Sequence, residues 1–216
     1  MQNKKKSTLI KDAVALFLIT LISGMALSYV YIITKDPIDA QIAQKTEEAY
    51  QRAYHEADQF EKDEQLMLQA KETELNSLNP AYKGTTIQEI NKALDSNGNV
   101  IGYLIKVSTK KGYNKSTPME IAIAYAKDGT VKGIDIITIK ETVNLGMLAA
   151  EPEFKDQFTG KQVDQFVLSG DGASADNQID AISGATITSR AINDAVNAGI
   201  GFLKEYAADL GGGADE

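Results

Sequence analysis

The chain has 216 residues, 43% hydrophobic and 24% charged, which suits one globular domain with accessory segments. It has no cysteine and a single histidine, which excludes disulfides, iron–sulfur clusters, thiolate or histidine-based metal sites and a Ser-His-Asp triad. The net charge of −8 argues against nucleic acid as a partner.

The N-terminal segment predicts a membrane anchor. Residues 1–12 form a lysine-rich tail, and residues 13–34 contain no charged side chain. A helix over residues 13–34 is about 33 Å long, enough to cross the bilayer core. The positive-inside rule then predicts a single-pass protein of the cell (inner) membrane, with a cytoplasmic N-terminus and an extracytoplasmic C-terminal domain. The alternative is a cleaved signal peptide with a small-residue site at Ala26-Leu27-Ser28, but the apolar run continues past it.

Residues 35–79 predict a helical stalk. They are rich in Ala, Glu, Gln, Lys and Leu and contain no glycine. Asp36-Pro37 marks the predicted start and Asn79-Pro80 the end. Apolar residues are sparse, so we expect one or two largely solvated helices with His55 on the surface.

After Pro80 the apolar pattern changes to a period of two, which predicts an antiparallel sheet. The predicted strands are Thr86–Leu94, Val100–Val107, Met119–Ala126 and Val131–Ile139. Turn residues at Asp95–Gly98 and Asp128-Gly129 pair them into two hairpins.

The segments that follow are a mixture of loops and short elements. The loop Lys110–Pro118 is either a solvated turn or a rim that approaches an anion with Gly112 and a lysine. Phe154 and Phe158, spaced i,i+4, predict a short helix packed on the core. Gln165–Ser169 predicts a strand and 170–178 a polar loop.

The stretch Asp180–Ser189 stands at the start of an amphipathic helix that runs to about Tyr206. Helix amides and the helix dipole favour an anion at this position, especially a phosphate. The residues alone leave open whether the stretch is a phosphate site or a plain N-cap. Its hydroxyl residues are Ser183, Thr186, Thr188 and Ser189. Residues 209–216 are expected to form a disordered tail.

The sequence Asp-Ala-Ile-Ser-Gly-Ala-Thr at 180–186 resembles the flavinylation motif of the FMN-binding domain. That domain occurs in the G subunit of Rnf complexes and in the C subunit of sodium-pumping NADH:quinone reductases. The resemblance implies covalent FMN, joined by a phosphoester to Thr186, with Ser183, Gly184, Ala185 and Thr188 around the phosphate. Asp180 belongs to the same motif and serves either attachment or electron transfer. No catalytic residue and no metal are implied.

A second segment carries the same resemblance. The family's flavin-wrapping loop usually reads Glu-Thr-Pro-Gly-Leu-Gly, and four residues of this chain match it. They are Glu141, Thr142, Leu145 and Gly146. Val143 and Asn144 replace the usual Pro-Gly, which leaves the shape of the loop open, and Ser169 stands near a position where relatives often carry a basic residue.

The resemblance implies an α+β protein with one N-terminal transmembrane helix, a helical stalk and an antiparallel-sheet FMN-binding domain with packed helices over residues 80–208. Its implied role is electron transfer within an ion-translocating ferredoxin:NAD oxidoreductase complex, without catalysis on its own. The implied partners are the other membrane subunits, the lipid bilayer and a flavin transferase for maturation.

Three alternatives remain at this point. The first two are the C-type subunit of a sodium-pumping NADH:quinone reductase and a stand-alone extracytoplasmic flavoprotein. The third belongs to another class, a non-redox anchored scaffold domain in which Ser-Gly-Ala-Thr only caps a helix.

Overall fold

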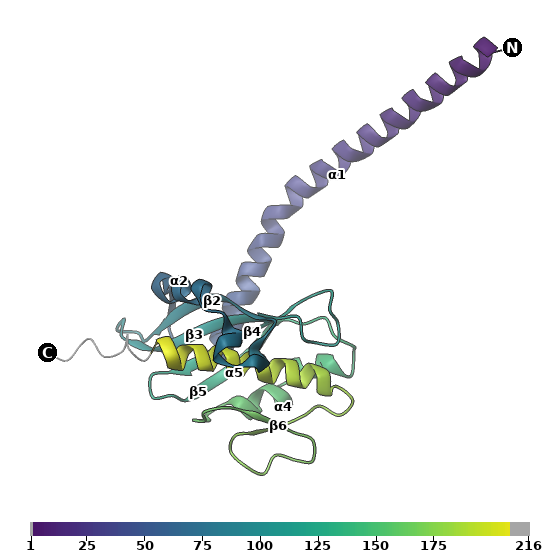
Figure 1. The fold of residues 1–216 in the computed structure, drawn as a ribbon. Helices are drawn as coiled ribbons and strands as arrows, with labels where there is room; N and C mark the ends of the chain where they lie inside the picture. Colours follow the sequence, from purple (N-terminus) through teal and green to yellow (C-terminus); the bar gives the residue numbers. More distant parts are fainter. Residues whose placement is uncertain (1, 208–216) are drawn as a thin grey trace. The chain divides into compact units, whose positions relative to one another are not determined.

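The computed structural model describes residues 2–207, with side chains from residue 10 onward. The chain falls into two units, Met1–Lys45 and Thr46–Glu216. Figure 1 shows the order of the elements along the chain. The predicted disordered tail, residues 209–216, lies outside the described part.

The first unit consists of the larger part of helix α1 (Gln2–Ala53). Its most apolar window has a mean hydropathy of 2.2 and none of it is buried, so this helix is long and apolar enough to cross a membrane. The predicted break at Asp36-Pro37 is wrong, because α1 continues through Pro37. One proline removes a single helical hydrogen bond, and good helix formers such as Ala40, Gln41, Ala43 and Gln44 follow it.

The second unit is built on a five-stranded antiparallel sheet in the order β1-β2-β3-β4-β5 (Figure 1). The strands are β1 Gln59–Lys62, β2 Thr85–Leu94, β3 Val100–Thr109, β4 Met119–Ala126 and β5 Val131–Thr138. Both predicted hairpins are confirmed. Gly98 and Gly129 in their turns have φ of 82° and 88°, a conformation that glycine adopts without strain.

The prediction of a helical stalk over residues 35–79 is wrong in its second half. Helix α1 ends at Ala53, and the next segment joins the sheet as β1, where Phe60 lies opposite Ala93. Pairing with the edge of β2 outweighs the helix propensity of this polar segment. Three short helices follow: α2 Glu64–Glu72, α3 Leu75–Leu78 and the 3-10 turn η1 Pro80–Tyr82. They pack on the domain through Leu66, Leu75 and Tyr82, which are buried.

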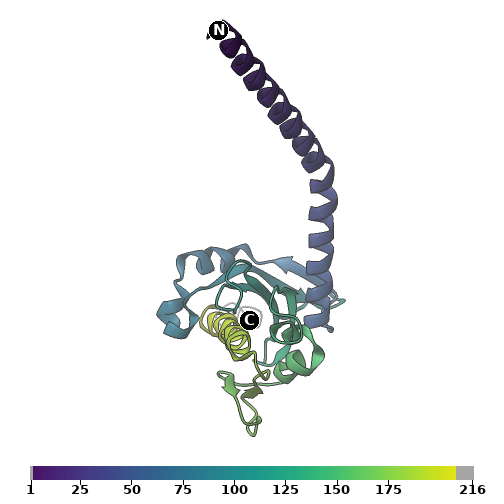
Figure 2. The same ribbon diagram turned by 90° about the vertical axis from the view of Figure 1, so that its right-hand side faces the viewer.

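Helices cover both faces of the sheet, as the end-on view in Figure 2 shows. Helix α5 (Thr186–Tyr206) lies on one face, so close that a Cβ on Gly199 would meet Ile123 Cδ1 at 2.8 Å. The last turns of α1 lie on the other face in a second buried cluster. Tyr54 of this cluster donates a hydrogen bond of 3.1 Å to the Ile101 carbonyl, and burial raises the pKa of Tyr54 to about 12. The cluster contains Tyr50, Ala53, Tyr54, Ala57, Ala93, Leu104, Ala122 and Ala124.

Short elements complete the domain beside β5. The 3-10 turn η2 (Gly146–Ala150) leads into α4 (Pro152–Lys155) and η3 (Asp156–Phe158). Phe154 and Phe158 are buried edge to face with ring centroids 5.7 Å apart, which confirms the predicted short helix on the core. Strand β6 (Val167–Ser169) pairs in parallel with β7 (Gln178–Asp180). The α+β fold class is confirmed.

Candidate functional site

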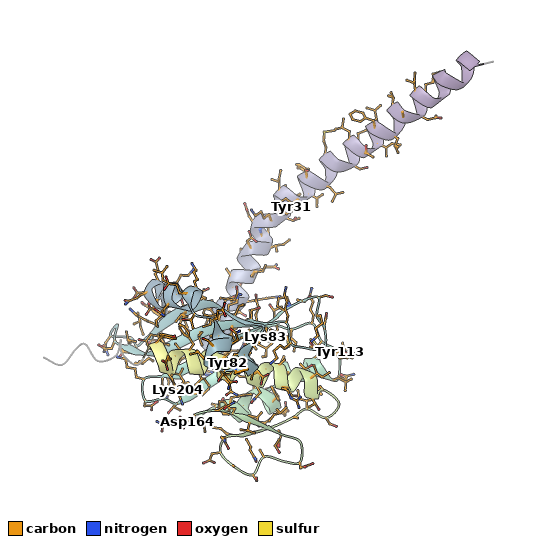
Figure 3. The ribbon with its side chains drawn as sticks, viewed as in Figure 1. Tyr31, Tyr82, Lys83, Tyr113, Asp164 and Lys204 are labelled. Atoms are coloured by element: carbon orange, nitrogen blue, oxygen red, sulfur yellow. The ribbon has the colours of Figure 1, made fainter. Side chains whose placement is uncertain are left out.

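A cavity of about 490 Å³ lies where the first turn of α5 meets the loops that follow β3 and β5. Its volume is within the range of about 300–1,000 Å³ that is usual for cofactor sites. The lining residues are Tyr113, Glu141, Thr142, Leu145, Gly146, Gly184, Ala185, Thr186, Ile187 and Thr188. The fold therefore brings together two segments that are about 40 residues apart in the sequence, 140–146 and 180–189. Figure 3 shows Tyr113 at the tip of its loop, near the N-terminal end of α5.

Helix α5 begins without a side-chain cap. Ala185 occupies the N-cap position and no side chain bonds to the first turn. The N–H groups of Thr186, Ile187 and Thr188 donate to no acceptor among residues 2–207. The simple N-cap interpretation is therefore wrong. Free amides at the positive end of the helix dipole are instead the groups that bind a phosphate.

The hydroxyl groups of the motif differ in their exposure. Ser189 is fully buried and is used internally, since its Oγ accepts from the Ile182 N–H at 3.0 Å and donates to the Ala185 carbonyl at 3.1 Å. Thr188 is 1% exposed and donates to Glu141 Oε2 at 3.2 Å. Thr186 is exposed, lines the cavity, and its hydroxyl has no hydrogen-bond partner in the described part of the chain. Of the two motif threonines that line the cavity, Thr186 is thus the one with an accessible hydroxyl.

Glu141 connects three separate segments around the cavity. Its Oε1 accepts the Asn114 N–H at 3.1 Å, and its Oε2 accepts the Thr188 hydroxyl at 3.2 Å. A Cβ on Gly112 would collide with the same carboxylate. Glu141 was predicted as a flavin contact, and it does line the cavity, but both carboxylate oxygens are bonded to the protein.

Two glycines allow the cavity walls to approach each other. A Cβ on Gly146 would meet Glu141 Cβ at 2.7 Å and Thr188 Oγ1 at 2.8 Å, so only glycine fits between the loop and α5. Gly184 has a φ of 74° and turns the chain into the helix.

The loop after β5 keeps a sharp turn although Pro-Gly is absent. Asn144 has a φ of 58°, the one non-glycine residue with positive φ in the described chain. Asparagine tolerates this left-handed conformation better than most residues. The N–H groups of Leu145 and Met147 both donate to the Thr142 carbonyl at 3.2 Å, which closes the turn. Asn144 thus occupies the place where the family's loop usually has glycine.

Some predicted residues lie outside the cavity lining. Ser183 and Asp180 are exposed and are not among the lining residues. The Asp180 N–H donates to Gln157 Oε1 at 2.6 Å. In the loop Lys110–Pro118 the lysine prediction fails for Lys111, because its ammonium binds the Asp194 carboxylate and the Ala81 carbonyl.

Two lining residues were missed by sequence reasoning, Tyr113 and Ile187. Both are largely exposed, at 67% and 54%, and both lie in segments that the sequence had already marked. Ile187 directly follows Thr186 in the motif, and both residues are exposed in the first turn of α5.

Residues 112–201 match the model of the FMN-binding domain family, and every lining residue of the cavity falls within them. The fold and the site therefore define an FMN-binding domain. The chain is 31% identical over 208 residues to the G subunit of the Na(+)-translocating ferredoxin:NAD(+) oxidoreductase complex of Acetobacterium woodii, covering 93% of this chain and 96% of the relative. The chain belongs to the family of G subunits of ion-translocating ferredoxin:NAD(+) oxidoreductase (Rnf) complexes.

A second relative of the same kind comes from Clostridium ljungdahlii. It is the G subunit of the proton-translocating ferredoxin:NAD(+) oxidoreductase complex, 29% identical over 194 residues, covering 86% of this chain and 90% of the relative. Among solved structures, NqrC of Shewanella oneidensis is similar, with 22% identity, a TM-score of 0.48, and coverage of 57% of this chain and 60% of that one.

Proposed function

We propose that this chain is a membrane-anchored electron-transfer subunit that carries FMN covalently, joined by a phosphoester to Thr186. The observation that supports this most is the pairing of an exposed, unbonded Thr186 hydroxyl with three free amides in the same helical turn. The hydroxyl would hold the phosphate, and the amides would bind its remaining charge.

The walls of the cavity suit the rest of the flavin. Tyr113, Leu145 and Ile187 present exposed apolar surface toward the same space, and an isoalloxazine ring needs such contacts. Gly146 and Gly184 let the two cavity walls pack closely, because an added Cβ would meet Thr188 Oγ1 at 2.8 Å and Leu145 Cδ2 at 3.1 Å, respectively. The ring would supply the redox chemistry, while the protein would hold and orient it.

Attachment requires an activated flavin, and we propose a flavin dinucleotide delivered by a flavin transferase. The Thr186 hydroxyl would form the new P–O bond to the FMN phosphorus and release its proton to solvent. The phosphoanhydride bond of the dinucleotide would break, with a nucleoside monophosphate as the leaving group. No electrons are exchanged in this step.

The membrane topology is part of the proposal. The basic tail, residues 1–12, would stay in the cytoplasm, residues 13–34 would span the cell membrane, and the flavin domain would lie outside. A covalent bond suits that side of the membrane, where a lost cofactor is hard to replace. The other membrane subunits of the complex would be the electron donor and acceptor.

Intact-mass spectrometry tests the attachment. The full chain is co-expressed with a flavin transferase, solubilised in detergent and compared with Thr186→Val. We expect one added FMN on the wild type and on the control Thr159→Val, whose threonine is also exposed, and none on Thr186→Val. FMN on Thr186→Val would disprove the choice of residue. A wild type without FMN would favour a non-redox scaffold domain.

A further inference from the structure

One face of α5 carries a cation next to the proposed attachment residue. Thr186, Arg190 and Asp194 follow each other at intervals of four residues, so their side chains lie along the same side of the helix. Long helical side chains lean toward the helix N-terminus, which directs Arg190 toward Thr186. Arg190 is exposed.

Arg190 has no anionic partner in the described chain. The carboxylate one turn further on, Asp194, is bound by Lys111, which also binds the Ala81 carbonyl. No ion pair or hydrogen bond involves the Arg190 guanidinium among residues 10–207. The cation is therefore free to bind an anion that is not part of this protein.

Other cations are poorly placed for a phosphate on Thr186. The cavity lining contains no lysine or arginine, and Arg190 lies in α5 just beyond it, one turn after Thr186. Lys111, the lysine of the neighbouring loop nearest to α5, is held by Asp194. Within the described chain, Arg190 is thus the unpaired cation closest in helical spacing to Thr186.

We propose that Arg190 is a positioning residue that pairs with the phosphate on Thr186 and fixes the phosphate against the first turn of α5. A phosphodiester keeps one negative charge at neutral pH. The helix amides approach it from the helix axis, and a guanidinium from the next turn can donate two parallel hydrogen bonds to its oxygens. The inference rests on the proposed attachment at Thr186.

The test uses the full flavinylated chain in detergent and three variants: Arg190→Gln, Arg190→Lys and, as a matched control, Lys127→Gln. Lys127 is an exposed cation without an ion pair in the described chain. It lies in the turn between β4 and β5, at the end of the hairpin away from the cavity. The measurements are the intact mass, the ³¹P NMR resonance of the phosphodiester, and the change of that resonance between low and high sodium chloride.

In Arg190→Gln we expect a shifted ³¹P resonance that no longer responds to salt. Lys127→Gln should keep the wild-type resonance. In Arg190→Lys the resonance should lie between those of Arg190→Gln and the wild type. Unchanged resonance and salt response in Arg190→Gln would overturn the proposal. Loss of FMN in Arg190→Gln with recovery in Arg190→Lys would support it, because charge would then be what matters.

Loss of FMN in both Arg190 variants would overturn the proposal, since the transferase and not the phosphate would then need the arginine. Failure of the proposed function has a different signature, which is a wild-type chain that gains no FMN at all.

Discussion

The hydroxyl of Thr188 donates a hydrogen bond of 3.2 Å to the carboxylate of Glu141, and this bond joins the first turn of α5 to the segment after β5. The other oxygen of Glu141 holds the Asn114 N–H. The carboxylate therefore fixes the relative position of three cavity walls. Substitutions of Glu141 can distinguish the effect of its hydrogen bonds from the effect of its negative charge.

Replacing Glu141 with alanine should destabilise the domain and impair FMN incorporation. The Asn114 N–H and the Thr188 hydroxyl would lose their acceptor. Each of these donors that stays buried should lower the free energy of unfolding by about 1–3 kcal/mol. Glutamine keeps an oxygen for Asn114 and an NH₂ group that can donate to the Thr188 hydroxyl. We therefore expect Glu141→Gln to retain stability in urea unfolding and to retain FMN by intact mass. A stable Glu141→Gln protein without FMN would show that the negative charge itself is required.

Replacing Gly146 with alanine should disrupt the contact between the loop and α5. The new Cβ would lie 2.7 Å from Glu141 Cβ and 2.8 Å from Thr188 Oγ1, so one of the two segments must move. Such overpacking costs about 1–3 kcal/mol. The control is Gly170→Ala, where the added Cβ has no neighbour within 4 Å. Equal midpoints in urea for the two variants would contradict the steric explanation.

Position 144 should accept a substitution to glycine but not to a β-branched residue. Its φ of 58° lies in the left-handed region, which costs L-residues about 1–2 kcal/mol and glycine nothing. We expect Asn144→Gly to unfold at or above the wild-type temperature and Asn144→Val to unfold several degrees lower. Calorimetry of the detergent-solubilised chain measures both, and a Val variant as stable as the Gly variant would exclude backbone strain at this position.

Asp135 should contribute to stability through two cations. It is 2% exposed, and it pairs with Arg52 of α1 at 2.8 Å and with Lys155 of α4. Asp135→Asn would keep the shape but leave Lys155 without its counter-charge and Arg52 with only the exposed Glu48 at 3.7 Å, with an expected loss of about 2 kcal/mol in the free energy of unfolding. The control is Asp164→Asn, which breaks the pair with Lys204 at a fully exposed carboxylate. Solvent screens that pair, so its loss should not be measurable in urea unfolding.

Patterns within short segments of the sequence predicted much of this molecule. The period-two segments and their Gly-containing turns gave both hairpins, and the spacing of Phe154 and Phe158 gave their short helix. The residues of 141–146 and 184–188 assigned to flavin binding all line one cavity. Each of these signals lies within a few residues of the feature that it predicts.

Features that depend on distant segments were not accessible in this way. The pairing of Gln59–Lys62 depends on the free edge of β2, more than 20 residues further along the chain. Lys111 looked available for an anion until the fold brought Asp194 to it. The bonds of Glu141 to Asn114 and Thr188 likewise join residues that no local pattern connects.

The last turns of α1 have a further consequence for where the domain begins. Tyr50, Ala53 and Tyr54 are each no more than 5% exposed, and they cover the sheet face opposite α5. A protease cut near Lys45 would release a domain with its core complete. A cut after Tyr54 would uncover Leu104, Ala122 and Ala124, and the released fragment would aggregate through that apolar face.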